Sequence, residues 1–293
     1  MPALEAVGAA RYSREQARRP FEGAAKLRRW GTLLGFCALA LAMLATSASS
    51  DERTMKELAP TGTLRVGLVF APSMSIFFVV KDADGNPRGV TADLAGALGR
   101  ALGLPVQYVL FPNSGQATDA VEAGMVDVSF MPVDEERKAR VAFGPNYVLG
   151  ESTYMVTAAS GATTVDDVDR EGVRVIGIAN TTTIRAAGRT LKNTTISPVT
   201  SVGDAVAALR DGKADAFALS RDSLPTYVKQ IPGSRITDGA FQQIGIAIAV
   251  AKGRPAGLAA VTAFMEAAKR DGTVRRALDA AGFDDAVAPP LTQ

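Results

Sequence analysis

A faint internal repeat constrains this chain more than any single motif does, because it places one α/β pattern twice along the sequence. The segment Leu64–Val69 (LRVGLV) is echoed by Arg174–Ala179 (RVIGIA). Helix, glycine and strand follow one another in Asp119–Val128, and the same order returns in Asp204–Ala216. Chance similarity between Ala- and Val-rich segments is the alternative, but two echoes in the same order favour two similarly built lobes.

Strands and helices alternate around these repeats. Residues 63–70 and 106–111 are apolar runs of strand length, and between them Thr91 can cap a helix that ends at Gly103. This alternation predicts an α/β fold with largely parallel sheets. Ligands in such sheets bind beyond the carboxyl ends of the strands, so two lobes that face each other there would form a ligand cleft.

The first 50 residues predict a signal peptide rather than a part of the fold. A basic patch at residues 26–30 precedes an apolar run at 31–45, and small residues suited to signal peptidase follow at 46–50. A retained membrane anchor is the alternative reading of the apolar run. We expect cleavage between Ser47 and Asp51, which would place the mature protein in the periplasm.

The composition of the remaining chain excludes several kinds of chemistry. The sequence contains no histidine, and its single cysteine, Cys37, lies inside the predicted leader. A zinc site or a serine–histidine hydrolase is therefore nearly excluded, and we expect no metal and no cofactor. Seven of the 32 basic and three of the 30 acidic residues lie in the leader, so the mature chain has a net charge of −2. This charge gives no sign of a nucleic-acid partner.

A charged segment after an apolar strand supplies the main candidate for ligand binding. The strand stops at Met131 and Pro132, and the turn that follows carries Arg137. A guanidinium at the carboxyl end of a strand is well placed to bind a carboxylate through two parallel hydrogen bonds. The alternative is that Arg137 is a solvated charge in a turn.

The second copy of the repeat offers two further groups of candidates. A strand runs into a helix that opens at Thr181, Thr182 and Thr183, where free backbone N–H groups and hydroxyls can bind an anion. These threonines can also serve only as helix caps. A later strand ends at Ser220, and Asp222 just beyond it can meet a ligand ammonium or form an ordinary surface ion pair.

The ordered set of segments resembles family 3 extracytoplasmic solute-binding proteins, the periplasmic receptors of polar amino-acid ABC transporters. The likeness covers most of residues 60–285. The matching pieces are Gly62–Gly67, Asp84-Gly85, Gly89, Asp93-Leu94, Leu102-Gly103, Ala123–Asp127, Glu136-Arg137, Val141–Phe143, Pro145–Tyr147, Gly177–Thr183 and Gly212–Ala216.

The resemblance implies a periplasmic-binding-protein type II-like fold, with two α/β lobes joined by two crossing strands and a ligand cleft between them. We expect a discontinuous first lobe at residues 51–155 plus 247–293 and a second lobe at 156–246. The crossing strands should contain the apolar runs 153–157 and 244–250.

The resemblance also assigns roles to residues of the expected cleft. Arg137 falls on the arginine that binds the α-carboxylate of the ligand, and Thr182 and Thr183 fall where the second lobe meets the same group. Ser220 falls where the family often keeps an aspartate for the α-ammonium, and Phe78 lies near the aromatic wall.

Two departures from the family pattern bear on this carboxylate site. Pro132 stands where family members often offer a backbone N–H, and proline has none. Asp134 adds a negative charge about one turn before Arg137. If Asp134 forms a salt bridge with Arg137, the arginine is structural. Both departures indicate that the carboxylate site of this chain is weakened or reoriented relative to the family pattern.

The resemblance therefore predicts a monomeric, non-enzymatic periplasmic component of an ABC transporter. It would capture an amino acid or related small carboxylate and deliver it to a permease in the inner membrane. Two alternatives stay open: a periplasmic dehydratase on the same fold, and a ligand receptor for a sensory membrane partner. The absence of histidine and of a clear acid–base pair counts against the dehydratase.

Overall fold

The computed structural model describes residues 52–285 and 287–289. The predicted signal peptide lies outside these residues. The chain from Arg53 onward forms one compact unit. Among the described residues, no helix is long and apolar enough to cross a membrane.

Strands of the described chain form one nine-stranded sheet with the order β4-β1-β5-β11-β6-β9-β7-β8, and β10 pairs with β6. The bounds are β1 Leu64–Val69, β4 Val106–Phe111, β5 Val128–Pro132, β6 Val141–Val156, β7 Val175–Ile178, β8 Ile196–Val199, β9 Ala216–Ser220, β10 Arg235–Ile236 and β11 Gln242–Ala251. The short strands β2 (Val80–Lys81) and β3 (Pro87–Arg88) form a separate antiparallel pair.

Helices pack along the sheet. They are α2 Val90–Leu102, α3 Ser114–Glu122, α4 Glu135–Arg140, α5 Val165–Val168, α6 Thr182–Thr190, α7 Val202–Arg210, α8 Leu224–Val228, α9 Pro255–Arg270 and α10 Thr273–Ala281, with 3-10 turns η1 Ala158–Ser160 and η2 Arg221–Ser223. Helix α2 shows how the sequence specifies such an element. Leu94 and Leu98 are fully buried on one face, and Gly103 ends the helix in the left-handed conformation.

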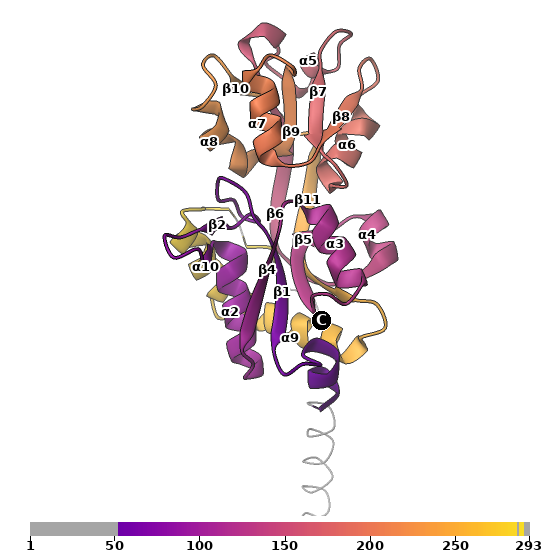
Figure 1. Cartoon of the computed structure of the whole chain (residues 1–293), viewed down its shortest axis with the longest axis vertical. Coiled ribbons are helices and arrows are strands. Elements are labelled where there is room, and N and C mark those ends of the chain that lie inside the picture. The colour runs from indigo at the N-terminus through magenta and orange to yellow at the C-terminus, as the bar shows by residue number, and fades with distance from the viewer. Residues whose placement is uncertain (1–51, 286, 290–293) are drawn as a thin grey trace, which may run out of the picture. The chain divides into compact units, whose positions relative to one another are not determined.

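Two long strands connect the two halves of the sheet (Figure 1). The first half contains the parallel strands β4, β1 and β5, and we call it lobe 1. The second half contains the parallel strands β9, β7 and β8, and we call it lobe 2. Strand β6 pairs with β11 in lobe 1 and with β9 in lobe 2, so β6 and β11 are the crossing strands. This arrangement confirms the predicted fold class, whereas the exact lobe boundaries stay a prediction.

The internal repeat has a physical counterpart in two matching ion pairs. In lobe 1, Arg65 donates through its backbone N, Nε and Nη2 to the Asp127 carboxylate, which lies just before β5. In lobe 2, Arg174 donates to Asp215 in the same three ways just before β9. The repeat is therefore structural. The sequence comparison matched Gly67 with Gly177, whereas the structure matches Arg65 with Arg174, so the predicted alignment of the two segments was shifted by one residue.

Two local predictions were wrong. Thr91 does not cap α2, because the helix starts earlier and its cap position is Gly89. The segment expected to be a charged turn forms the short helix α4, because the Asp134 side chain accepts a hydrogen bond from the Arg137 backbone N and caps a helical turn.

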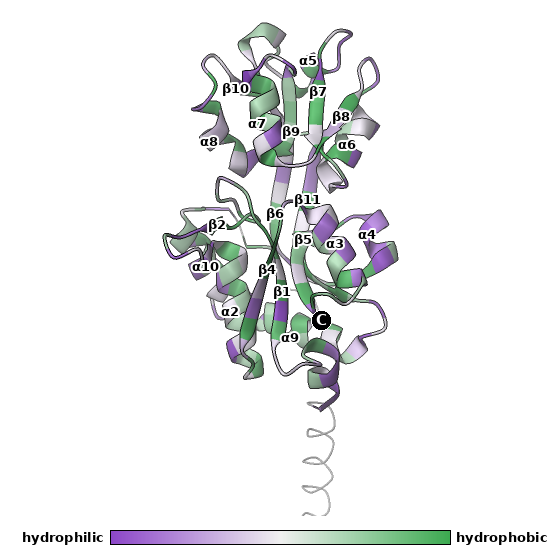
Figure 2. Ribbon diagram, in the orientation of Figure 1, coloured by the Kyte–Doolittle hydropathy of each residue, from purple (hydrophilic) through white to green (hydrophobic). Residues whose placement is uncertain are grey.

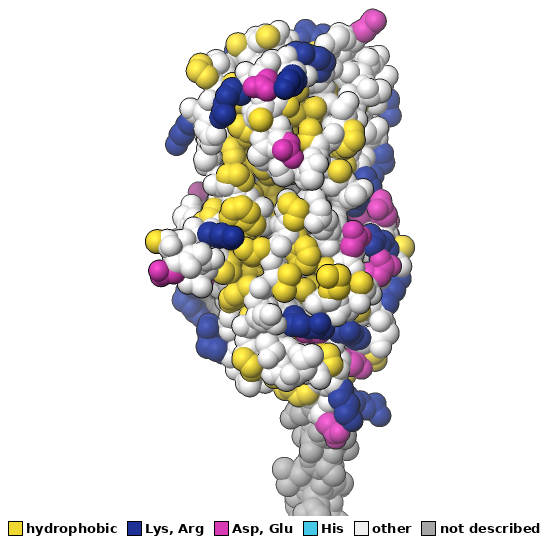
Figure 3. Space-filling model, viewed as in Figure 1, with side chains coloured by type: hydrophobic (Ala, Val, Ile, Leu, Met, Phe, Trp, Pro, Cys, Tyr) yellow, Lys and Arg dark blue, Asp and Glu magenta, His cyan; other side chains and the backbone are white. Residues whose placement is uncertain are grey.

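The strands carry most of the apolar character of the fold, and the outer helix α4 is strongly hydrophilic (Figure 2). Strand β4 forms the edge of lobe 1, with Val109, Leu110 and Phe111 only partly buried. Figure 3 shows the apolar side chains of this face gathered over β4 and β1.

The repeated ion pairs differ in burial, which gives a matched test of the fold. Asp127 is fully buried and Arg65 is 22% exposed, whereas Arg174 is 53% exposed beside Asp215. We expect Asp127→Asn to lower the free energy of unfolding by about 2–3 kcal/mol, because it removes the charge of a fully buried carboxylate that accepts three hydrogen bonds from the partly buried Arg65. Asp215→Asn should cost about 1 kcal/mol or less. Urea unfolding measures both free energies. Equal losses would contradict the expectation that the more buried ion pair of lobe 1 contributes more to stability than the more exposed pair of lobe 2.

Candidate functional site

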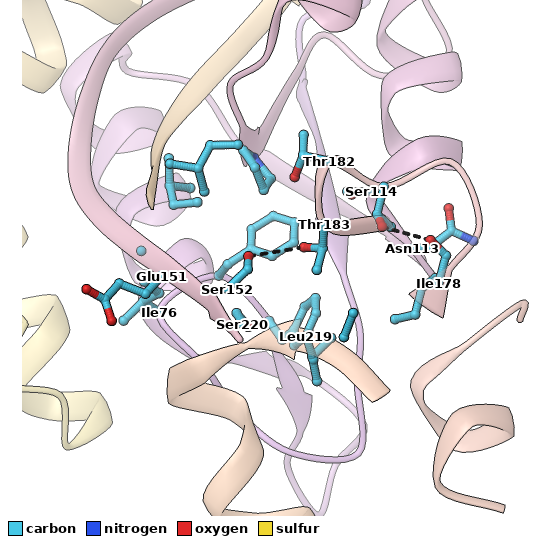
Figure 4. Close-up of a pocket in the computed structure, with 18 residues that line it drawn as sticks. Ile76, Asn113, Ser114, Glu151, Ser152, Ile178, Thr182, Thr183, Leu219 and Ser220 are labelled. Atoms are coloured by element: carbon cyan, nitrogen blue, oxygen red, sulfur yellow. Dashed lines mark hydrogen bonds between the residues drawn. The ribbon is translucent and has the colours of Figure 1, made fainter. Parts of the chain in front are cut away.

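A small cavity of about 40 Å³ lies between the two lobes. It opens beyond the carboxyl ends of β5, β7 and β9, where the parallel-sheet rule predicts a ligand. Figure 4 shows the side chains around it. The lining residues are Ile76, Phe77, Phe78, Asn113, Ser114, Pro132, Gly150, Glu151, Ser152, Ile178, Thr181, Thr182, Thr183, Ala218, Leu219, Ser220, Ile244 and Ile246.

The amino ends of two helices meet at one end of this cavity. Asn113 caps α3 by accepting a hydrogen bond from the Gln116 backbone N at 2.9 Å. Thr181 caps α6 by accepting from the Ile184 backbone N at 3.3 Å, and it donates to the Ile178 carbonyl at 2.7 Å. The next N–H groups of both helices have no partner within their own helix, and the helix dipoles are positive there. This end of the cavity is suited to an anion.

Arg137 lies behind the same end of the cavity. Its Nη2 donates to the Ser114 hydroxyl at 2.6 Å, and its Nη1 donates to the Pro132 carbonyl at 2.9 Å. The prediction placed Arg137 at a cleft edge, but the residue is only 2% exposed because Ser114 and Pro132 stand between it and the cavity. Among the described residues, no carboxylate forms an ion pair with its guanidinium.

The environment of Arg137 is electrostatically unfavourable for its charge. Burial, and next the positive charge of Arg185, lower the pKa of Arg137 to about 9, which still leaves it charged at neutral pH. A buried cation held only by neutral groups is stabilised by any anion that approaches it. The site therefore has a strong preference for a negatively charged group.

Asp134 does not hold Arg137 in a side-chain salt bridge, which was the structural alternative. Its carboxylate caps α4 and also accepts from the Nε of Arg185 in α6 at 2.9 Å. Glu136 approaches the same Nε at 3.0 Å. This ion pair joins lobe 1 to lobe 2, so the structure gives Asp134 a partner across the cavity rather than a place in its lining.

Five of the eight predicted ligand-binding residues line the cavity. Thr182 is fully buried, and the Thr183 hydroxyl lies 3.4 Å from that of Ser152 (Figure 4). Thr181 lines the cavity while it caps α6, and Ser220 bonds the Ser223 hydroxyl at 2.7 Å. Phe78 forms part of the apolar wall, with its ring centroid 5.1 Å from that of Phe77. Their contact with a ligand stays a prediction.

Asp222 lies outside this cavity. It lines a neighbouring pocket, and its Oδ2 accepts from the Ile76 backbone N at 2.7 Å, a second link between the lobes. Burial is the main reason why the pKa of Asp222 is raised, to about 6, and no protein group bonds its buried Oδ1 among the described residues. Asp222 is therefore not part of the cavity lining, where the sequence suggested it would meet a ligand.

The contribution of lobe 1 to this end of the cavity was not predicted. Asn113 and Ser114 follow β4 after one residue, Pro112, and an Asn or Ser just after an apolar run is the usual signal of a helix start. That signal was available, but nothing in the sequence indicated that α3 begins opposite α6. Ser152, Ile178, Leu219 and Ile244 were also missed, because their positions depend on how the crossing strands pair.

Two α/β lobes that share a cavity, with one end of it suited to an anion, are the architecture of bilobal binding proteins. A model of the bacterial extracellular solute-binding proteins, family 3, matches residues 69–280. This chain belongs to that family, as its sequence predicted.

Individual relatives agree with this assignment. The glutamine-binding protein of Geobacillus stearothermophilus is 22% identical over 211 residues, which cover 71% of this chain and 79% of that protein. A mutant of ArgBP from T. maritima has the same fold, with a TM-score of 0.69 and 24% identity over 78% of this chain and 99% of that chain. An ancestral amino acid-binding protein, a precursor of cyclohexadienyl dehydratase, has a TM-score of 0.67 and 28% identity, covering 78% and 98%.

Helix α3 closely approaches lobe 2, so a substitution at this contact tests whether the lobes must come together to bind a ligand. A Cβ added at Gly115 would lie 2.5 Å from the Asn180 Cβ and 2.8 Å from its carbonyl oxygen, and Asn180 itself has a φ of 59°. We expect Gly115→Ala to hold the lobes apart and to weaken ligand binding, with little change in thermal stability. Small-angle scattering with added ligand should show no compaction.

Gly203→Ala is the matched control, because Gly203 is likewise the second residue of a nine-residue helix. Its added Cβ would meet only the Ser201 hydroxyl, at 3.6 Å. If both variants bind alike, the contact between Gly115 and Asn180 is not part of ligand capture.

Proposed function

We propose that this protein captures a small carboxylate, either an amino acid or a related acid, between its two lobes. The observation that carries this proposal is the buried guanidinium of Arg137, which has no carboxylate partner among the described residues. A ligand carboxylate at the starts of α3 and α6 would supply the missing charge. The names of the relatives, which include a glutamine-binding protein and an ArgBP, support the same class of ligand.

Capture would proceed by closure of the lobes about the crossing strands β6 and β11. Three contacts outside the cavity support a closed state: Asp134 with Arg185, Asp222 with the Ile76 backbone, and the Tyr227 hydroxyl, which accepts from the Ser73 backbone N at 3.1 Å. Each joins a residue of lobe 1 to one of lobe 2. A ligand that fills the cavity would add contacts to both lobes at once and shift the population toward closure.

The biological role that best fits this capture is delivery to a transporter. We propose a monomeric periplasmic protein, released by cleavage of the predicted signal peptide, that hands its ligand to an ABC permease in the inner membrane. Membership of an extracellular solute-binding family supports this role. Reporting to a sensory membrane partner is the alternative, and a pull-down with membrane proteins distinguishes the two.

An enzymatic role is the other alternative, favoured by the likeness to a precursor of cyclohexadienyl dehydratase. The cavity offers little for acid–base chemistry. Among its described lining residues only Glu151 is charged, and its carboxylate pairs with Arg221 at 3.1 Å. We therefore propose binding without turnover, and an assay for release of product from prephenate-like acids tests this directly.

The proposal predicts a specific loss of binding on removal of one guanidinium. Arg137→Met should weaken the affinity for a carboxylate, first identified by a thermal-shift screen, by about 2–4 kcal/mol, or roughly 30- to 1,000-fold. Arg137→Lys should recover only part, because an ammonium keeps the charge but cannot hold Ser114 and the Pro132 carbonyl in the planar geometry of the guanidinium. Calorimetry measures both constants.

Arg140→Met is the matched control. Arg140 ends the same helix, but it pairs with Asp119 and Glu122 on the surface and does not line the cavity. Its loss should leave the affinity nearly unchanged. An unchanged affinity in Arg137→Met, together with a lower melting temperature, would show that Arg137 is structural.

A further inference from the structure

The cavity is polarised, with charge recognition at one end only. The polar end contains the starts of α3 and α6, with Arg137 behind them. The remaining wall is apolar, apart from the hydroxyls of Ser152 and Ser220 and the Glu151 side chain. The apolar lining residues are Ile76, Phe77, Phe78, Ile178, Ala218, Leu219, Ile244 and Ile246.

No acidic side chain of the described lining is directed at the position where a ligand ammonium would lie. Glu151 is the single acidic lining residue among those described, and Figure 4 shows its carboxylate turned away from Thr182, Thr183 and Ser220. The carboxylate is 45% exposed and paired with Arg221. Asp222, the other acid nearby, lines the neighbouring pocket and is bonded to the Ile76 backbone.

The hydroxyls at the apolar end suit neutral partners. Ser220 shares a hydrogen bond with Ser223, and Ser152 donates to the Gln242 side chain at 3.1 Å while lying 3.4 Å from the Thr183 hydroxyl. A hydroxyl can both donate and accept, so these groups can bond a ligand hydroxyl or carbonyl. They cannot compensate the full charge of a buried ammonium.

We propose that the preferred ligands are small carboxylates without an ammonium group, namely short fatty, 2-hydroxy or 2-oxo acids, rather than α-amino acids. This inference rests on the proposed function, because it assumes that the acid group binds at the end near Arg137. The cavity is small, about 40 Å³, so the test begins with short acids. An α-amino acid would place its ammonium among apolar side chains and neutral hydroxyls, with no counter-charge from the described lining, and burial of such a charge is costly.

The test compares acids that differ only at the α-carbon. One series is L-alanine, L-lactate, pyruvate and propionate, and a second is L-valine with its 2-hydroxy, 2-oxo and unsubstituted five-carbon counterparts. Calorimetry on the protein should give at least about tenfold tighter binding for the best ammonium-free acid than for the amino acid of its series.

The outcomes separate the two proposals. Amino acids that bind as tightly as their ammonium-free counterparts would overturn the present inference and leave carboxylate capture intact. If no acid of either series binds, carboxylate capture of this size class is wrong and the inference fails with it.

A substitution should reverse the preference. Ser220 lies at the end of β9 in the part of the lining without charged groups, so Ser220→Asp adds a negative charge there that can compensate an ammonium. We expect Ser220→Asp to tighten binding of L-alanine or L-valine about tenfold or more and to weaken binding of the ammonium-free acids. Ser197→Asp, on the exposed part of β8, controls for the added charge and should change neither. If Ser220→Asp does not fold, the affinities of the unaltered protein for the two series of acids still decide whether ammonium-free acids are preferred.

Discussion

The guanidinium of Arg137 is the group on which the organisation of the site depends. It is buried and stays charged at neutral pH, and its hydrogen bonds go to the Ser114 hydroxyl and to the Pro132 and Asn180 carbonyls rather than to an acid. Burial of an arginine in this way costs stability, because the nearby charges of Asp134 and Glu136 offset the desolvation of the guanidinium only in part. In the proposed binding mode, the ligand carboxylate supplies the missing negative charge, and the relief of this unfavourable burial contributes to the free energy of binding.

The repeated architecture explains how two parts of the chain far apart in sequence create one anion site. Each lobe builds a parallel sheet whose strand order is anchored by the same pair, Arg65 with Asp127 or Arg174 with Asp215. Each sheet then delivers a helix start to its carboxyl edge. The crossing strands β6 and β11 turn these two edges toward each other, so both helix dipoles act on one small cavity.

Prediction from the sequence succeeded where the signal was local. The strand at Val106–Phe111, the α6 start at Thr181 and the α/β class followed from apolar runs and capping residues. Long-range placement could not be predicted. The burial of Arg137 depends on Ser114 from another helix, and the partner of Asp134 is Arg185 of the other lobe. Such contacts depend on how the lobes meet, which no local pattern encodes.

A crystal structure of the protein with a bound small carboxylate, such as lactate or propionate, would show whether Arg137 serves the ligand. We expect the carboxylate to lie at the starts of α3 and α6, with the Arg137 guanidinium donating to it directly or through the Ser114 hydroxyl. A carboxylate bound elsewhere, with the hydrogen bonds of Arg137 to Pro132 and Ser114 unchanged, would show that it does not.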